Sequence, residues 1–246
     1  MTSSGRELLR EISGRLNRMA HLKSLAAPNT WPIARKKWVF VTKPNPGPHT
    51  EEYSMPLIVI LRDILKIAHT TQEVKKIVAA GKVMVNGIPR KEMKYPVGIL
   101  DTLGIPDISL QCRMLFNPQG KFAFKKVPKE QASARYVKIR DKTTLKGKRT
   151  QLNFLDGTNM FVEKDVYKVG DTLVLHNSKV KEHLKFEKGA WVYLIAGKHI
   201  GKKGKLEEIH SFKGSQPDRI VLKRGDEAID TLRSYAFVVD EGFEYE

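Results

Sequence analysis

Cysteine is almost absent from this 246-residue sequence, which contains only Cys112. One cysteine cannot form a disulfide within the chain, and it cannot supply the thiolates of a cysteine-based zinc site. The seven histidines show no metal-ligand spacing with carboxylates or with Cys112. We therefore expect no metal site, and we expect the chain to work in a reducing, cytoplasmic environment.

Long hydrophobic runs are also missing. No apolar run approaches the roughly 20 residues that a membrane-spanning helix needs, and the N-terminus lacks the apolar core of a secretion signal. Residues 1–18 have an amphipathic helical pattern, but their four arginines stand against two glutamates, Glu7 and Glu11. This excess of positive charge is small for a helix that binds a membrane surface. We expect a partly ordered arm and no membrane partner.

Acidic residues are few relative to basic ones. The chain has 44 Lys and Arg against 27 Asp and Glu, a formal net charge of +17. Such an excess repels itself in a compact monomer and favours a polyanionic partner. Nucleic acid is the expected partner, and an anionic membrane surface is the alternative.

The stretch from Met55 to Arg90 is the most informative part of the sequence. Its first half predicts a helix with one apolar face, formed by Leu57, Ile60, Leu61, Ile64 and Leu65. Thr70 and Glu73 have the spacing of a capping box for a second helix, which Gly81 would end. Asn86-Gly87 then predicts a tight hairpin.

This stretch resembles the S4-type, or alpha-L, RNA-binding domain, in which two short helices and a hairpin present a basic face to folded RNA. The sequence K-V-x-V-N-G is intact from Lys82 to Gly87, whereas the second helix only approximates the family pattern. The alternative is a helix–turn–helix–hairpin whose lysines simply face water, because charge runs are usually solvated surface.

Residues 19–40 have little periodicity and interleave cations with Trp31 and Trp38. An extended segment of this kind can follow a phosphate backbone. We interpret both tryptophans as core residues and the cations as RNA contacts. A proline-rich joint at 43–49 then leads into the first helix.

From about Ile108 the sequence has a β pattern. Arg113–Phe116 and Lys121–Phe124 read as a hairpin, and strands follow at 136–139, 151–155, 159–162 and 171–175. Asp156-Gly157 is a further tight turn. Short strands with frequent turns predict a small barrel or sandwich, with 142–149 as a basic loop or strand end.

The last segment reads as a strand at 191–195, a glycine-rich basic loop, and a second strand at 206–209. It resembles the KOW motif of ribosomal and transcription-associated proteins, with Gly201 at the tight bend. The loop also resembles a phosphate-binding P-loop, but three residues instead of four separate its glycines, and Lys203 stands where Ser or Thr is needed. We therefore expect no nucleotide and no other cofactor.

These motifs occur in one order, together with HLK-x-LAAP at 21–28, PGPH at 46–49 and YPVGILD at 95–101. The chain resembles the S4e family of small-subunit ribosomal proteins from archaea and eukaryotes over residues 19–246. The resemblance implies an α+β fold in four parts: a basic arm (1–42), an alpha-L domain (43–105), a central β domain (106–175) and an SH3-like KOW barrel with an acidic tail (176–246). It also implies a non-enzymatic, cytoplasmic role on the ribosome, with 16S-type ribosomal RNA and neighbouring ribosomal proteins as partners.

The expected RNA-binding residues lie on all four parts. They are His21, Lys23, Arg35, Lys36, Lys37, Arg62, Lys66, Lys75, Lys76, Lys82, Asn86, Arg90, Lys91, Lys146, Lys148, Arg149, Lys198, His199, Gly201, Lys202 and Lys203.

Two alternatives remain. Gly98–Thr102 faintly resembles the catalytic G-R-L-D of pseudouridine synthases, but the arginine is missing, and Asp101 reads as a cap or turn residue. A regulatory or quality-control factor that binds ribosomes loosely is the second alternative. We expect no catalytic residues and no small-molecule substrate.

Removal of residues 1–18 tests the expected limits of the RNA-binding region. Isolated helices of this length are marginal in water, and the segment lies outside the family resemblance. A variant beginning at Met19 should bind small-subunit RNA as tightly as the full chain in a filter-binding titration. A loss of more than about tenfold, roughly 1.4 kcal/mol, would show that the arm is a true contact.

Overall fold

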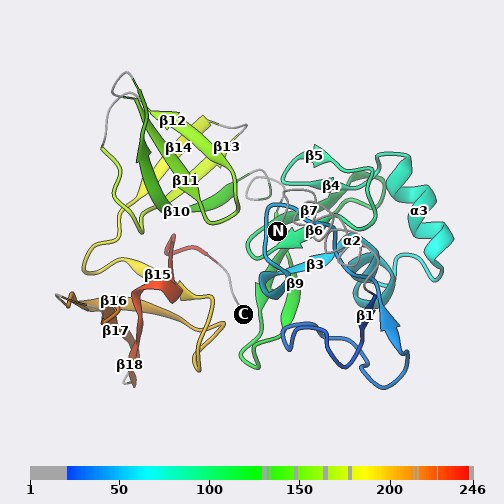
Figure 1. Ribbon diagram of the computed structural model, residues 1–246, viewed down its shortest axis with the longest axis horizontal. Coiled ribbons are helices and arrows are strands. Elements are labelled where there is room, and N and C mark those ends of the chain that lie inside the picture. Colours follow the sequence, from blue (N-terminus) through cyan, green and yellow to red (C-terminus); the bar gives the residue numbers. More distant parts are fainter. Residues whose placement is uncertain are drawn as a thin grey trace, which may run out of the picture.

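The computed structural model describes residues 21–128, 132, 134–146, 149–162, 166–176, 179–212, 214, 216–225 and 227–243. The described chain is mostly β with few helices, and it forms an N-terminal unit followed by two further five-stranded sheets (Figure 1). The predicted helix at 1–18, the end of the acidic tail and Lys148 lie outside the described residues.

The N-terminal unit combines helices with three small sheets. Its helical segments are η1 (Glu51–Tyr53), α2 (Leu57–Val59), η2 (Ile60–Ile64), α3 (Thr71–Ala79) and η3 (Pro106–Ile108). Two strand pairs are β1 (Leu22–Lys23) with β2 (Phe40–Val41), and β3 (Ser54–Pro56) with β6 (Pro96–Gly98). The third sheet has the order β5-β4-β7-β8-β9, from β4 (Met84–Val85), β5 (Ile88–Pro89), β7 (Thr102–Ile105), β8 (Leu110–Phe116) and β9 (Phe122–Lys126).

The first predicted helix is present as α2 and its π-helical continuation η2, where the Leu65 N–H bonds to the Ile60 carbonyl at 2.8 Å. Its surroundings differ from the prediction. Ile58 and Val59 are buried as well as the predicted face, so the start of the helix is enclosed on all sides. A helix with one apolar face is expected to lie at the surface of a domain, whereas the start of this helix lies in the interior.

The second helix and the hairpin follow the predicted local chemistry. The Glu73 N–H donates to the Thr70 hydroxyl at 3.2 Å, and the Thr70 N–H donates to the Glu73 carboxylate at 3.3 Å, which confirms the capping box. Gly81 (φ +72°) ends the helix, and Asn86 and Gly87 take φ values of +52° and +77° in the hairpin turn. These are the left-handed conformations that such positions require.

The predicted hairpin at 113–124 is confirmed as β8 and β9, which extend the sheet of the N-terminal unit. β8 pairs antiparallel with β7, from Thr102↔Arg113 to Ile105↔Leu110. The short connection through η3 keeps these strands adjacent, as short links between antiparallel strands usually do. The sheet of the N-terminal unit therefore continues to Lys126.

The second sheet has the order β12-β11-β10-β13-β14. Its strands are β10 (Arg135–Thr144), β11 (Thr150–Phe154), β12 (Asn159–Val162), β13 (Thr172–His176) and β14 (Lys179–Leu184). Asp156-Gly157 makes the predicted turn, with Gly157 at φ +73°. β14 joins this sheet through its antiparallel pairing with β13.

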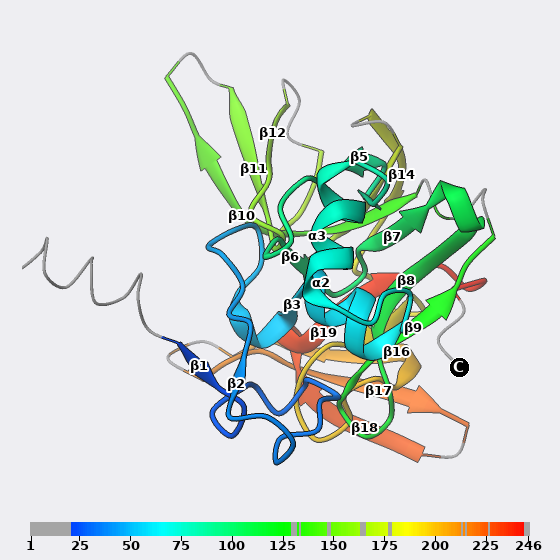
Figure 2. The ribbon, with the colours of Figure 1, turned by 90° about the vertical axis from the view of Figure 1, so that its right-hand side faces the viewer.

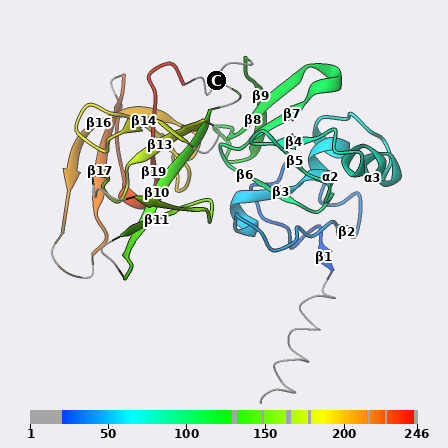
Figure 3. The same cartoon turned by 90° about the horizontal axis from the view of Figure 1, so that it is seen from above.

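The third sheet has the order β18-β17-β16-β15-β19. It contains β15 (Trp191–Leu194), β16 (Lys203–His210), β17 (Arg219–Arg224), β18 (Glu227–Leu232) and β19 (Ala236–Val239), with the short helix η4 (Arg233–Tyr235) before β19. Figure 3 shows both C-terminal sheets on one side and the N-terminal unit on the other.

β15 and β19 are buried on both faces. Val192 and Leu194 pack in the sheet's own core, whereas Tyr193 and Ile195 belong to the core of the N-terminal unit. β19 alternates in the same way, with Phe237 facing the N-terminal core. Strands covered on both faces carry continuous apolar runs and no polar alternation.

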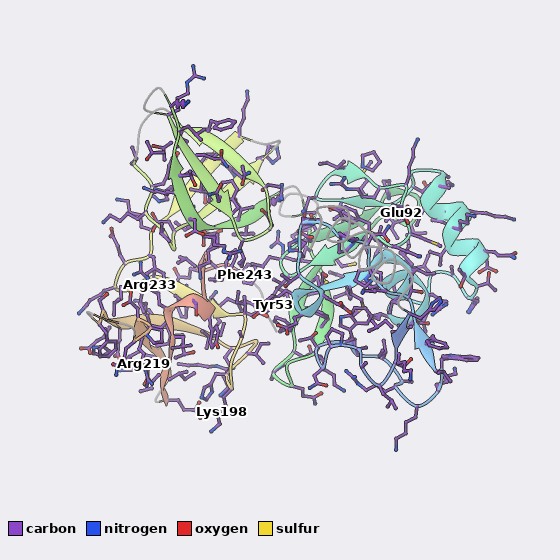
Figure 4. All side chains as sticks on the ribbon, viewed as in Figure 1. Tyr53, Glu92, Lys198, Arg219, Arg233 and Phe243 are labelled. Atoms are coloured by element: carbon purple, nitrogen blue, oxygen red, sulfur yellow. The ribbon has the colours of Figure 1, made fainter. Side chains whose placement is uncertain are left out.

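Polar contacts add to this apolar junction. The Tyr193 hydroxyl accepts from the Phe116 N–H at 2.8 Å and lies 3.2 Å from the Phe116 carbonyl, to which it donates. Lys138 of the second sheet donates to the carbonyls of Ser234 and Ala236 at 2.9 and 2.6 Å. Burial, together with nearby Arg233, lowers the pKa of Lys138 to about 8. Figure 4 shows Tyr53 and Phe243 between the units.

His49 and Asp101 form a buried ion pair beside this junction, with His49 Nε2 2.9 Å from Asp101 Oδ2. Burial alone would lower the pKa of His49, but the charge and hydrogen bond of Asp101 raise it above its ordinary value. Burial likewise opposes ionisation of Asp101, yet His49, Asn86 and the Gly98 N–H hold the pKa of this carboxyl below its usual range.

Substitution of Gly201 tests the close backbone contact between the third sheet and the N-terminal unit. Gly201 takes the predicted bend (φ +81°), and a Cβ there would lie 2.8 Å from the Asn117 carbonyl oxygen and 2.9 Å from that of Phe116. Gly201→Ala should lower the free energy of unfolding in urea by about 2–5 kcal/mol, from left-handed strain plus overpacking against backbone.

The control is Gly87→Ala, where φ is +77° and no atom lies within 4 Å of the added Cβ. It should lose only the conformational part, about 1–2 kcal/mol. Equal losses in the two variants would show that the contact of Gly201 with β8 contributes nothing.

The pH dependence of unfolding tests the His49–Asp101 pair. A histidine whose pKa rises on folding stabilises the fold fully below its unfolded pKa near 6.5, and this contribution is lost as the pH rises through the folded pKa. Asp101 stays ionised throughout that range, because its pKa is lowered. The free energy of unfolding of the wild type should therefore fall above pH 6.5 relative to His49→Gln.

The glutamine variant keeps a donor but cannot titrate. His176→Gln, at an exposed position, should retain the wild-type pH dependence in the same urea titrations. Parallel curves for the wild type and His49→Gln would contradict the proposed contribution of the pair.

Candidate nucleic-acid interface

The N-terminal unit contains a groove of about 980 Å³ between the arm and the first helix. Several predicted RNA-binding cations meet there with aromatic side chains. The basic and aromatic residues in its lining are Lys37, Trp38, Phe40, Arg62, Lys66 and His69. Figure 2 turns this part of the molecule toward the viewer, with β1 and β2 beside the helical segments.

The arm is held in place by residues that fold inward. Trp31 is 1% exposed, and its indole N–H donates to the Ser54 carbonyl at 2.9 Å. Arg35 donates to the carbonyls of Ala27 and Pro28 at 2.7 and 2.5 Å. Arg35 therefore fixes the loop and remains half-buried, so its predicted RNA contact stays a prediction.

Trp38 differs from the prediction in the opposite direction. We expected it in the core, but its side chain is 67% exposed, and the neighbouring Phe40 is 56% exposed. Trp31 already fills the buried position next to β3, and Trp38 follows the turn that Arg35 holds. The indole therefore remains at the surface.

The groove is cationic. The sequence from His21 to Thr50 contains no Asp or Glu, whereas it contains Lys23, Arg35, Lys36, Lys37 and Lys43. Asp63 is the acidic residue in the lining, and Arg62 binds it through two contacts of 2.8 and 2.9 Å. The predicted RNA-binding residues His21, Lys23, Lys36 and Lys37 are all exposed.

A second basic surface lies around α3. Lys75, Lys76 and Lys91 are exposed. Lys82 is 2.6 Å from Asp107, and both side chains are about half exposed. A surface pair of this kind contributes about 0–1 kcal/mol, so a phosphate can compete for the lysine. Arg90 is half-buried, with its guanidinium 4.4 Å from the centre of the Tyr95 ring.

Asn86 was predicted to contact RNA, but its side chain is used inside the fold. Its amide donates to Asp101 at 2.7 Å, and its carbonyl oxygen accepts from the Thr102 N–H at 2.9 Å. Asp101 also accepts from the Gly98 N–H at 2.8 Å, as expected for a turn residue. The aspartate that resembled a synthase residue is therefore a buried structural acceptor, 4% exposed.

The glycine-rich loop divides into surface and interior residues. Lys198 is exposed, and Lys202 is half-buried with Glu227 3.7 Å away. Lys203 was predicted to contact RNA but is 6% exposed, and it donates to the carbonyls of Glu241 and Phe243 at 2.6 and 3.2 Å. Burial lowers its pKa, opposed by Glu241 and Asp240.

Gly201 is buried against β8, so it is also not available to RNA. His199 is half-buried in the same loop. In the second sheet, Lys146 and Arg149 are exposed at the tip between β10 and β11, where the Leu145 N–H bonds to the Arg149 carbonyl at 2.9 Å. The predicted cations are thus distributed over separate surfaces, with β10 and β11 on the side of the molecule opposite α3 (Figures 1 and 3).

The prediction from sequence missed Phe40 and His69 and placed Trp38 in the core. The sequence feature that could have indicated this groove is the run of thirty residues from His21 to Thr50 without an acidic residue. Among the described residues, no three His, Cys, Asp or Glu side chains lie together as metal ligands would. No helix in the described ranges is long and apolar enough to cross a membrane.

Two family models match the chain. The model of ribosomal family S4e matches residues 108–181, which run from η3 into β14. The RS4NT (NUC023) domain model matches residues 19–52, which include the arm and one wall of the groove.

Curated relatives match over most of the chain. The protein named small ribosomal subunit protein eS4 from Methanocella arvoryzae is 43% identical over 221 residues, which covers 89% of this chain and 93% of the relative. The protein of the same name from Methanocaldococcus jannaschii is 41% identical over 232 residues, covering 90% and 94%.

A solved structure shows the same fold. The crystal structure of the 30S ribosomal protein S4e from Thermoplasma acidophilum superposes with a TM-score of 0.67 at 30% identity, covering 77% of this chain and 96% of that one. The ordered motifs, the mostly β architecture and the near full-length relatives agree, and this chain belongs to the S4e family of ribosomal proteins.

Proposed function

We propose that this chain is a structural constituent of the small ribosomal subunit and binds the subunit's RNA through several separate basic surfaces. The observation that supports this most directly is the match to relatives named small ribosomal subunit protein eS4 over about nine-tenths of the chain. In this role the chain works in the cytoplasm, with small-subunit ribosomal RNA and neighbouring ribosomal proteins as partners.

The net charge and its distribution fit this role. A charge of +17 spread over the groove, α3, the β10–β11 tip and the glycine-rich loop can neutralise phosphates of several RNA helices at once. Each neutralised phosphate releases condensed counterions, which favours binding at low salt. Folded RNA is recognised mostly by shape and backbone, so basic surfaces in a fixed arrangement suit it.

We also propose which segments form the S4-type module, the KOW motif and the three units of the fold. The segment from α2 through β5 is the S4-type RNA-binding module, supported by the capping box and the Asn86-Gly87 hairpin. The segment from β15 to β16 is the KOW motif, supported by the bend at Gly201. The strand pairing supports units of 21–127, 134–184 and 185–243, with boundaries later than those predicted at 105 and 175.

An enzymatic role has little support in the site. Asp101, which carried the resemblance to a pseudouridine synthase, is enclosed by His49, Asn86 and the Gly98 N–H. A catalytic carboxylate must reach a substrate, whereas this one is 4% exposed. We therefore propose that the chain is not an enzyme.

The salt dependence of RNA binding tests the proposal. In titrations of a small-subunit RNA transcript at several salt concentrations, Lys75→Ala/Lys76→Ala should lower the slope of log affinity against log salt by about 2, one for each phosphate contact. Lys198→Ala should lower it by about 1. The effects should add, because the two surfaces lie far apart.

Lys203→Met is the control, because Lys203 is buried. It should lower stability and leave the salt slope unchanged. A wild-type protein that washes off small subunits at high salt during sedimentation would contradict the proposed constituent role. Unchanged slopes in the α3 variant would show that Lys75 and Lys76 are ordinary solvated lysines.

A further inference from the structure

We propose that the groove beside the arm holds an unpaired RNA base stacked on Trp38, with Phe40 and Val39 completing the apolar surface. The ligand class is a single-stranded or looped RNA segment whose phosphates lie against Lys37 and Lys66. This inference rests on the proposed function, and it names the kind of RNA element that one of the basic surfaces receives.

The first support is the exposure of the apolar side chains. Trp38, Val39 and Phe40 are 67%, 70% and 56% exposed, and all three line the same groove. The chain buries Trp31 to 1% only seven positions earlier. A contiguous exposed aromatic patch marks an interaction site more often than isolated apolar residues do.

The second support is that the patch is held in a fixed shape. The Ser24 N–H bonds to the Val39 carbonyl at 2.9 Å, and Lys23 pairs with Phe40 in the β1–β2 register. The His21 ring lies 5.6 Å from the Phe40 ring. Because the backbone is already ordered, binding a base loses little conformational entropy there.

The third support is the charge around the patch. The Lys37 ammonium lies 5.8 Å from the centre of the Trp38 ring. Arg62 and Lys66 also line the groove, and the carboxylate of Asp63 is paired with Arg62. Aromatic faces beside cations such as Lys37 and Lys66 are the combination that binds unstacked bases together with their phosphates.

The exposed aromatic faces also favour unpaired RNA over double-stranded RNA as the ligand. Paired bases are already stacked on both faces and offer no face to an indole, whereas bases in loops and bulges do. The groove volume of about 980 Å³ lies at the upper end of the range for ligand pockets. It is therefore large enough for more than one nucleotide.

The test compares Trp38→Ala and Trp38→Phe with the wild type. The probes are a small-subunit RNA transcript and a fully paired RNA duplex. Trp38→Ala should weaken binding of the transcript by about 5- to 150-fold, the range for losing one base–aromatic stack. Trp38→Phe keeps a ring and should lose less. Both variants should bind the duplex as the wild type does.

Two readouts separate stacking from charge and from misfolding. The salt slope of Trp38→Ala should equal that of the wild type, because no phosphate contact is removed. RNA should quench the tryptophan fluorescence of the wild type more than that of Trp38→Phe, which retains only Trp31 and Trp191. The matched control is Phe161→Ala, an aromatic residue 65% exposed on β12, which should change neither affinity nor quenching.

The outcomes are distinct from those for the proposed function. If the wild type fails to bind the transcript, the proposed function itself is wrong. If the wild type binds and Trp38→Ala binds equally well, the stacking inference is overturned while the basic surfaces stand. If Trp38→Ala keeps its RNA affinity but assembled subunits carrying it lose a neighbouring protein, the groove is a protein-docking surface and the inference is also overturned.

Discussion

The structure depends on one packing constraint, which is that β15 and β19 must be covered on both faces. Val192 and Leu194 need the rest of their own sheet, while Tyr193 and Ile195 need the N-terminal unit. Burial of apolar surface is the main favourable term in folding. The N-terminal unit and the third sheet therefore share core residues, and Tyr136 of the second sheet packs against the same core, so the relative placement of their basic surfaces is fixed.

Polar groups at the junction make the arrangement specific. The Tyr193 hydroxyl satisfies both the N–H and the carbonyl of Phe116, and Lys138 and Lys203 each satisfy two backbone carbonyls. Buried carbonyls without partners would be costly, so each of these side chains holds the chain in one register. The overall basic composition thus serves two purposes, since some lysines support the fold and others face solvent.

Local features were predictable from sequence, whereas the use of individual cations was not. The capping box, the glycine at the end of α3 and the Asn86-Gly87 turn depend on a few neighbouring residues, and each was predicted correctly. Whether a lysine faces water depends on contacts distant in sequence. Lys203 is buried by residues about forty positions later, and Asn86 turns inward to a carboxylate fifteen positions later. Trp38 was misplaced because Trp31 occupies the buried position that either could have filled.

The shared core also bears on how the chain is made. Tyr193, Ile195, Phe237, Val239 and Phe243 complete the apolar core whose other buried members lie before residue 123. At the usual rate of protein synthesis, the stretch between them takes on the order of ten seconds to emerge. During that interval the N-terminal unit displays to the cell the apolar face that β15 and β19 later cover. The nascent chain therefore passes through a stage in which an exposed apolar surface and a strong positive charge are both accessible to other molecules. Because this stage follows from the architecture, the chain needs protection from aggregation until β15 and β19 have been made.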